Sequence, residues 1–288
     1  MQESQAITRK SASNLALAFI LLPRAKRDGM SALYAFCREV DDVADNESLP
    51  VLQRREGLAA WRADLRRACG TETPQFPVNR ELQPVIHQYH LAFEHFDALL
   101  QGVEMDLDTK RYADYDQLEL YCYRVASVVG LLSIEVFGYQ DPVCCEYAIC
   151  LGKALQLTNI LRDVRSDAQR GRIDLPLSEL ARFKVSPEEI LRLEYSPRFC
   201  ELATSVAQRA RHFYRLARET LPAADRRSMV AAGLMGSVYW RLLRKLERQR
   251  FDVFGPELIR LNKGQKLMLI LRSWCQFMSG AVLHSYGG

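Results

Sequence analysis

The chain has 288 residues, of which 48% are hydrophobic and 26% are charged, and this balance excludes an intrinsically disordered protein. Its 39 Lys and Arg residues against 35 Asp and Glu give a formal net charge of +4, which is too small to predict nucleic acid binding. The charge is compatible with an anionic substrate or an anionic membrane surface, and we find no apolar run of the ~20 residues that cross a bilayer.

Apolar residues recur at three- and four-residue spacings along most of the chain, which predicts helices. The periodic segments are residues 28–45, 51–69, 81–101, 116–137, 142–166, 198–220, 223–251 and 263–284. Strand-like alternation is nearly absent, and no loop is long enough to be a linker between domains. The sequence therefore predicts a single all-α domain over residues 1–288, with eight or more helices around one core.

The eight cysteines include no C-x-x-C pair, and most of them lie in apolar helical segments. This usage is typical of reduced thiols in a cytoplasmic protein. Near the C-terminus, LMLILRSWCQFMSGAVL is interrupted by Arg272 and is typical of an amphipathic helix. We expect this helix to pack on the core, with peripheral contact to the inner membrane as the alternative.

The stretch SALYAFCREVDDVAD (31–45) places a narrow charged stripe on an otherwise apolar helix. Tyr34, Arg38, Asp41 and Asp45 lie on one side of that helix, and the two carboxylates are one turn apart. Helices on the protein surface normally have the reverse proportion of apolar and charged residues. A single pair of this kind is usually a solvated acidic face, so the stripe alone does not indicate a site.

A second stretch, LGKALQLTNILRDVRSD (151–167), repeats the design about 120 residues later. Gln156, Asn159, Asp163 and Asp167 follow at +3, +7 and +11 and share one face. Carboxylates one turn apart repel each other, and Mg²⁺ compensates such charge by binding carboxylates together with substrate phosphates. Two such faces predict a cluster of Mg²⁺ ions that holds a diphosphate, and the nearby arginines would contact the diphosphate oxygens.

These motifs resemble those of the squalene/phytoene synthase family, the head-to-head trans-prenyl transferases. YAFCREVDDVAD is similar to the first aspartate-rich motif of that family, and QLTNILRDVRSDAQRGRIDLP is similar to the second. LLPRAKRDGMSALYAF, GVEMDL and YCYRVASVVGLLS also fit in order and spacing. The resemblance covers residues 11–275 and implies an all-α isoprenoid synthase fold with the active site in a central cavity.

The resemblance also implies roles for individual residues. The implied metal ligands are Asp41, Asp45, Asn159, Asp163 and Asp167. The implied substrate-binding residues are Ser11, Ser13, Arg38, Gln156, Asn159, Arg162, Lys263 and Lys266. The implied catalytic residues are Tyr34, Arg38, Tyr121, Arg162 and Tyr239. Two positions depart from the family pattern, because Asp174 stands where a Tyr is usual and Ser127 replaces a common glycine; we give Asp174 no role.

The expected chemistry is ionisation of an allylic diphosphate, which needs a neutralised leaving group, a dry pocket and aromatic faces near the cation. Ala126, Gly130 and Ser133 share one helix face, which either leaves a groove for prenyl tails or allows close helix packing. We expect Mg²⁺, with Mn²⁺ as an alternative, and no NADPH, because no dinucleotide-binding fingerprint occurs.

We expect a presqualene diphosphate synthase that condenses two molecules of farnesyl diphosphate and releases diphosphate for squalene or hopanoid synthesis. The alternatives are a phytoene synthase acting on geranylgeranyl diphosphate, a hydroxysqualene synthase, and a catalytically silent assembly or binding protein. Downstream isoprenoid enzymes are the expected partners, and nucleic acid is not.

Overall fold

The computed structural model describes residues 1–10, 18–278 and 286–287. The helices in chain order are α1 (Gln2–Lys10), η1 (Phe19–Leu21), α3 (Arg24–Asp45), α4 (Val51–Cys69), α5 (Pro77–Tyr89), α6 (Phe93–Asp108), α7 (Tyr115–Cys122), η2 (Tyr123–Ser127), α8 (Val128–Phe137), α9 (Cys144–Gln169), α10 (Leu177–Arg182), α11 (Pro187–Leu191), α12 (Pro197–Thr220), η3 (Ala223–Asp225), α13 (Val230–Arg248) and α14 (Lys263–Met278). Within these ranges the extended structure is one isolated bridge, between Arg111 and Ile173. The all-α prediction is confirmed.

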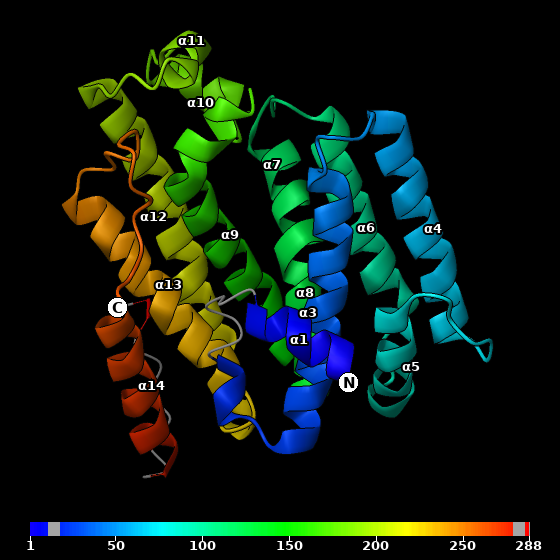
Figure 1. Cartoon of the computed structure of the whole chain (residues 1–288). Helices are drawn as coiled ribbons and strands as arrows, with labels where there is room; N and C mark the ends of the chain where they lie inside the picture. The colour runs from blue at the N-terminus through cyan, green and yellow to red at the C-terminus, as the bar shows by residue number, and fades with distance from the viewer. Residues whose placement is uncertain (11–17, 279–285, 288) are drawn as a thin grey trace.

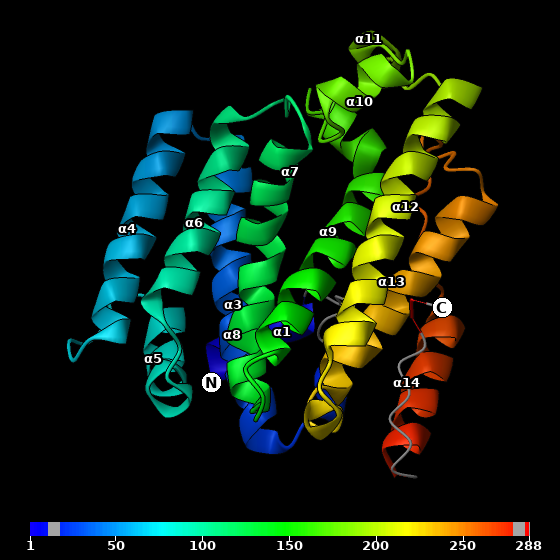
Figure 2. The ribbon, with the colours of Figure 1, turned by 180° about the vertical axis from the view of Figure 1, so that it is seen from behind.

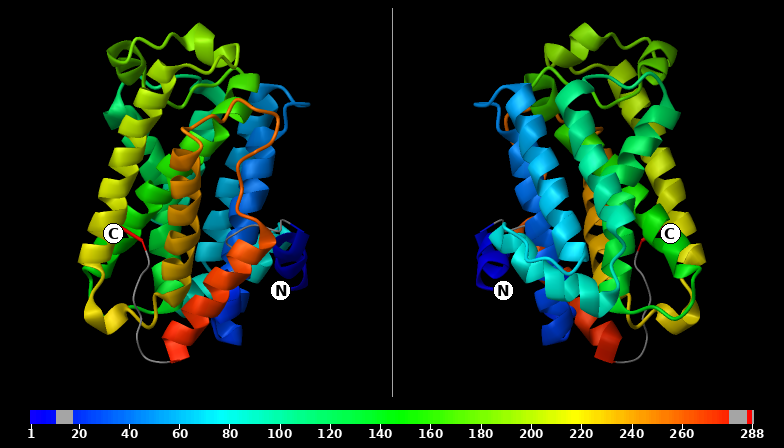
Figure 3. Two further views of the ribbon diagram at one scale, coloured as in Figure 1. Left: turned by 90° about the vertical axis from the view of Figure 1, so that its left-hand side faces the viewer. Right: turned by 90° about the vertical axis from the view of Figure 1, so that its right-hand side faces the viewer.

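The long helices form a bundle whose two halves are joined through the segment from α7 to α9 (Figure 1). On one side α3 packs against α4, α5 and α6, and on the other α9 packs along α12 and α13. The short helices α10 and α11 lie across one end of the bundle, as Figures 2 and 3 show. Helix α1 crosses outside α3 and contacts both α3 and α5.

Helix α3 begins directly after Pro23, whose fixed φ suits the start of a helix, and it ends at Asn46, whose backbone is no longer helical. One side of the helix is buried, and Phe36 is at its centre with no exposed surface. The Phe36 ring meets Trp61 and Phe96 edge to face, with ring centroids 5.9 and 5.3 Å apart. Truncating an aromatic side chain in such a core costs about 3–5 kcal/mol, so this contact fixes the apolar side of α3 inward and leaves its charged stripe facing the other way.

Three predicted segments differ from the observed helices. The segment 81–101 is two helices, because His90 adopts the left-handed conformation (φ 52°) that ends α5 before α6 begins. The segment 223–251 becomes regular only at α13, because the Asp225 carboxylate accepts hydrogen bonds from the backbone N–H groups of Gln140 and Asp141 and holds the preceding turn. The segment 116–137 contains a π-helical turn, η2.

One described helical stretch, Tyr115–Phe137, is long and apolar enough to span a membrane by length and composition. We expected no such stretch from the sequence, and on those two criteria that expectation was wrong. Half of its most apolar window is buried inside the fold, where the stretch packs between α6 and α9. Its apolar character is thus accounted for by its place in the core.

Candidate active site

The two aspartate stripes face each other across one hollow of about 410 Å³. Asp41 and Asp45 occupy the last turns of α3, while Asp163 and Asp167 occupy the last turns of α9. The two helices run in the same direction (Figure 1), so both present their C-terminal ends, which carry partial negative charge, to this hollow. The arrangement concentrates negative charge and favours a cation between the helices.

The acids are more accessible than the apolar helices that carry them led us to expect. The Asp45 side chain is 52% exposed and that of Asp163 is 25% exposed, and Asp41 is also reached by solvent inside the hollow. The reason is that the stripes line an open cavity instead of packing into the core. The prediction that the two stripes share one site is confirmed, and the expectation that all of their acids are buried was wrong.

Both stripes contain a carboxyl that resists ionisation. Burial among surrounding protein atoms, followed by the charges of Asp106 and Asp45, raises the pKa of Asp41 to about 7. Burial, followed by the charges of Asp174 and Asp163, raises the pKa of Asp167 to about 7. Water reaches Asp41, but protein surrounds its carboxyl on most sides. Hydration therefore offsets only part of the repulsion between Asp41 and the charges of Asp106 and Asp45. A bound cation would relieve it at both positions.

The donor set fits a hard divalent cation that shares its coordination with a phosphate. The side-chain oxygen Oδ1 of Asn159 lines this hollow, is buried, and has no hydrogen-bond partner among the described residues. In the described part of the chain, no three His, Cys, Asp or Glu side chains are grouped so that they hold a metal by themselves. Mg²⁺ typically takes one or two carboxylates, water and substrate phosphates, which is what this arrangement offers.

An ion cluster that lines the hollow was not predicted from the sequence. Arg172 donates from Nη1 to Asp106 Oδ1 at 2.6 Å and from Nη2 to Asp174 Oδ1 at 3.1 Å. Burial works to lower the pKa of the Arg172 guanidinium, but Asp106 and Asp174 reverse this and raise it. Asp174, to which we assigned no role from the sequence, therefore connects the segment after α9 to α6 through Arg172. Asp106 lies in the motif GVEMDL and Arg172 lies in RGRIDLP. Both motifs could be recognised in the sequence, but the contact between them could not be predicted from it.

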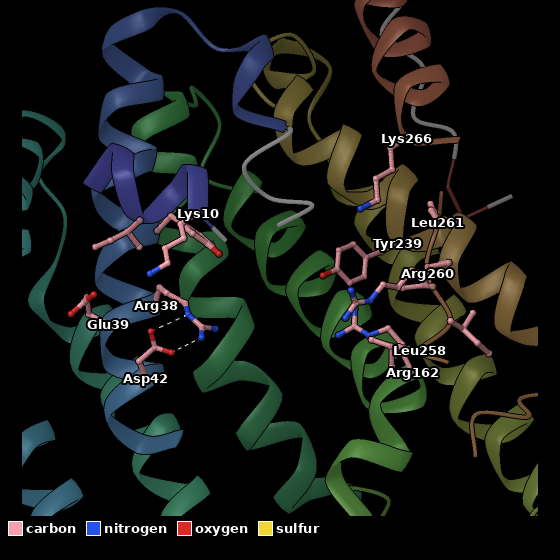
Figure 4. Close-up of a pocket in the computed structure, with 14 residues that line it drawn as sticks. Lys10, Arg38, Glu39, Asp42, Arg162, Tyr239, Leu258, Arg260, Leu261 and Lys266 are labelled. Carbon is pink, nitrogen blue, oxygen red and sulfur yellow. Dashed lines mark hydrogen bonds and ion pairs between the residues drawn. The ribbon is translucent and has the colours of Figure 1, made fainter. Parts of the chain in front are cut away.

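A second, basic cavity of about 790 Å³ adjoins the acidic hollow, and Arg38 and Arg162 line both. Figure 4 shows Arg38 on one wall, where it is paired with Asp42, and Arg162 with Arg260 and Tyr239 on the opposite wall. Lys10 and Lys266 extend toward the same space from α1 and α14. Lys10 and Arg260 were not predicted, because they lie in segments without a motif and far from the aspartate stripes in the sequence.

Arg162 is held at the boundary between the acidic and basic cavities. Its Nε donates to Asp163 Oδ1 at 2.7 Å, and a second, shorter hydrogen bond links the same two side chains. Burial works to lower the pKa of Arg162, but Asp163 and Tyr239 raise it, so the guanidinium stays charged. A fixed, partly buried positive charge at this position suits an anionic group that spans both cavities.

A third cavity, of about 210 Å³, is apolar. Ala126, Gly130 and Ser133 line it, as the groove alternative predicted, and Gly130 also packs closely against α9, because a Cβ atom added to it would lie 3.0 Å from the carbonyl oxygen of Ala148. The cavity shares Tyr239 with the basic cavity and shares Gln156 and Asn159 with the acidic hollow. The three cavities therefore form one composite site with an acidic, a basic and an apolar part.

The remaining predicted residues are placed as follows. Tyr34 lines the basic cavity, and Tyr121 lines the acidic hollow, where its hydroxyl donates to Asp106 Oδ2 over 3.4 Å. Ser11, Ser13 and the side chain of Lys263 lie outside the described residues. The predicted positions within the described part of the chain thus belong to the composite site.

Comparison with known proteins points to one family. The family model for squalene/phytoene synthase matches residues 8–265. Phytoene synthase of Arthrospira platensis is 38% identical over 264 residues, covering 86% of this chain and 84% of that protein. Presqualene diphosphate synthase of Zymomonas mobilis is 36% identical over 275 residues, covering 94% and 92%.

Solved structures agree with these sequence relationships. A dehydrosqualene synthase crystallised with a ligand superposes with a TM-score of 0.83 at 28% identity, over 96% of this chain and 95% of that one. Squalene synthase HpnC of Alicyclobacillus acidocaldarius superposes with a TM-score of 0.76 at 27% identity, over 86% and 93%. The likeness therefore extends over nearly the whole bundle.

Proposed function

Because the chain belongs to the squalene/phytoene synthase family and has its all-α isoprenoid synthase fold, we propose that it is a presqualene diphosphate synthase. It would join two molecules of farnesyl diphosphate head to head, release one diphosphate, and supply squalene or hopanoid synthesis. The observation that carries this proposal is the composite site, in which paired acids, fixed guanidinium groups and an apolar cavity meet. Each of these three cavities suits one portion of the two prenyl diphosphate molecules.

The acidic hollow suits the diphosphate that leaves. Mg²⁺, with Mn²⁺ as an alternative, would be held by Asp41, Asp45, Asp163, Asp167 and Asn159 and would neutralise the departing diphosphate as a Lewis acid. Arg38 and Arg162 border this hollow and are placed to donate hydrogen bonds to diphosphate oxygens. Departure of the diphosphate leaves an allylic cation, so nearby negative and aromatic groups stabilise the transition state.

The basic cavity suits the second diphosphate, which stays attached to the product. Lys10, Arg260 and Lys266 add to the positive charge of the two boundary arginines. The ring of Tyr239 lies between this cavity and the apolar one, where its face can stabilise positive charge on a prenyl chain. The apolar cavity keeps water from the cation, which water would otherwise quench.

Phytoene synthesis from geranylgeranyl diphosphate is the second candidate. The 38% identity to the phytoene synthase of Arthrospira platensis favours it. The longer match to the presqualene diphosphate synthase of Zymomonas mobilis and the modest apolar cavity favour the shorter C15 substrate. A hydroxysqualene synthase would use the same first step, and a catalytically silent binding protein would have no need for four acids around one hollow.

We infer a cytoplasmic protein that touches the inner membrane from one side. The side chains of Leu267, Met268 and Leu271 on α14 are each more than half exposed, which supports peripheral contact with lipid. The sequence favoured packing of this segment on the core, and α14 does pack against α13. Packing on the core and the proposed contact with lipid would therefore use different faces of this helix.

The proposal is tested by incubating the purified protein with farnesyl diphosphate and Mg²⁺, with and without NADPH. We expect a C30 diphosphate and released inorganic diphosphate in both reactions, because NADPH is not required. Turnover of geranylgeranyl diphosphate alone, to a C40 product, would favour phytoene synthesis. No turnover of either substrate would favour the binding protein.

A further inference from the structure

The acidic hollow and the apolar cavity meet at a neck formed by side chains that line both. These side chains are Val125 on η2 and Gln156 and Asn159 on α9. Of the described residues that line both cavities, Val125 is the one with an apolar side chain. The neck therefore has one apolar wall and one amide wall.

The position of Val125 is set by the π-helical turn η2, which interrupts the helical stretch from α7 to α8. Such turns contain one more residue than an α-helical turn and often occur at functional sites. The backbone enters and leaves η2 in the right-handed helical conformation, so the turn redirects side chains without breaking the helix. Val125 then faces the neck while Val129, one turn later, lines the apolar cavity alone.

Two glycines hold this turn from opposite sides. A Cβ atom added to Gly102 on α6 would lie 2.8 Å from Val125 Cγ1, and one added to Gly152 on α9 would lie 2.6 Å from the Ser127 Cα atom. Ser127 is fully buried, and its hydroxyl donates to the carbonyl of Ile149 at 2.9 Å. The backbone of η2 therefore has little room to move, and Val125 keeps its place at the neck.

The opposite wall is polar and partly unsatisfied. Asn159 Nδ2 donates to Gln156 Oε1 over 3.4 Å, whereas Asn159 Oδ1 has no partner among the described residues. A molecule that crosses the neck thus meets amide groups on one side and a branched alkyl group on the other. This pairing fits the point at which an apolar chain joins a polar, phosphate-bearing head.

We infer that Val125 is a further substrate-binding residue, whose side-chain size sets whether the first isoprene unit of a prenyl diphosphate fits through the neck. This inference rests on the proposed function, because it assumes a diphosphate in the acidic hollow and its chain in the apolar cavity. The size of the side chain at position 125 should therefore limit the width of a ligand next to its diphosphate, whatever the total length of the prenyl chain. Val129 lines the apolar cavity but not the acidic hollow, so enlarging its side chain should act on the part of the prenyl chain beyond the neck.

The test compares Val125→Phe with the matched control Val129→Phe, which adds the same bulk to the same helical stretch but away from the neck. Binding of farnesyl thiodiphosphate and of inorganic diphosphate, each with Mg²⁺, is measured by calorimetry, and circular dichroism verifies the fold. For Val125→Phe we expect the Kd of the prenyl ligand to rise about tenfold or more and the Kd of inorganic diphosphate to change less than about twofold. Val125→Leu, a smaller enlargement, gives an intermediate rise and keeps the test informative if the Phe variant fails to fold.

A C20 analogue, geranylgeranyl thiodiphosphate, separates width from length. Val125→Phe and Val125→Leu weaken both analogues by the same factor, whereas Val129→Phe weakens the C20 analogue more than the C15 analogue. The inference is overturned if both Val125 variants bind the prenyl analogues as the wild type does, or if they lose inorganic diphosphate equally. A wild type that binds both analogues tightly but turns over neither parent substrate would instead refute the proposed function.

Discussion

Asp41→Asn removes one negative charge from the acidic hollow while keeping the size of the side chain. Asp41 and Asp42 are adjacent on α3 but face different cavities, since Asp41 lines the acidic hollow and Asp42 lines the basic cavity beside Arg38. We expect opposite effects of this substitution on activity and on stability. We expect the variant to lose turnover, because the proposed Mg²⁺ ligand is gone, and the metal-free protein to become more stable, because neither a buried charge nor its repulsion by Asp106 and Asp45 remains.

The size of the stability gain follows from the raised pKa of Asp41. The shift from 3.8 to about 7 corresponds to about 4 kcal/mol if it acted in full. Because solvent reaches this carboxyl, screening reduces the expected gain to about 1 kcal/mol. The folded-state pKa lies above the unfolded-state value, so the penalty on the wild type grows as pH rises from 3.8 to about 7 and is complete above pH 7.

The assay is thermal unfolding of metal-free wild type, Asp41→Asn and Asp42→Asn at pH 7.5 in low salt. For a chain of this size, a gain of about 1 kcal/mol raises Tm by about 2–4 °C. Adding Mg²⁺ with inorganic diphosphate should stabilise the wild type and Asp42→Asn but not Asp41→Asn. Lower stability of Asp41→Asn than of the wild type, or retention of most of the turnover of Asp42→Asn, would contradict this prediction.

Three further predictions concern other parts of the molecule. Arg172→Gln leaves the carboxylates of Asp106 and Asp174 without their countercharge and should lower the free energy of unfolding, measured by urea titration, by about 3 kcal/mol. A loss below about 1 kcal/mol would show that this ion cluster does not hold the segment after α9 to α6. The pKa of Glu81 is lowered to about 2 because hydrogen bonds from the Met1 amino group and from Ser4 and Glu3 on α1 outweigh the effect of burial, so wild-type stability should fall as the pH decreases from 4.5 to 2. Glu81→Gln should lack this part of the pH dependence, and a pH profile identical to that of the wild type would show that these hydrogen bonds do not stabilise the fold. Arg260→Leu should raise KM for farnesyl diphosphate about tenfold with a smaller change in kcat, and an unchanged KM in steady-state kinetics would remove Arg260 from the diphosphate site.

The helical fold and the main features of the site were predictable because they depend on local spacing. Phe36 and its apolar neighbours fix which side of α3 faces the core, and the same 3.6-residue period places Asp41 and Asp45 together on the other side. The pairing of this stripe with Asp163 and Asp167 was also predicted correctly.

The rest depends on contacts between segments that carry no common pattern. Lys10 and Arg260 reach the basic cavity from the two ends of the chain, and nothing in their local sequence indicates this. The break at His90 depends on a left-handed backbone conformation that histidine adopts only occasionally, so helical periodicity alone runs through it. The π-helical turn η2 has the same spacing of apolar residues as the helices beside it, so the sequence does not indicate it. Its position between Gly102 and Gly152 depends on how α6 and α9 pack around it.

We propose that the facing acids and the adjoining apolar cavity bind two C15 diphosphates for one condensation. The decisive experiment is mass spectrometry of the products formed from farnesyl diphosphate and Mg²⁺ without NADPH. We expect a C30 cyclopropyl diphosphate and one inorganic diphosphate for every two substrate molecules consumed. Hydrolysis to farnesol alone, or no consumption of farnesyl diphosphate at any Mg²⁺ concentration, would contradict it.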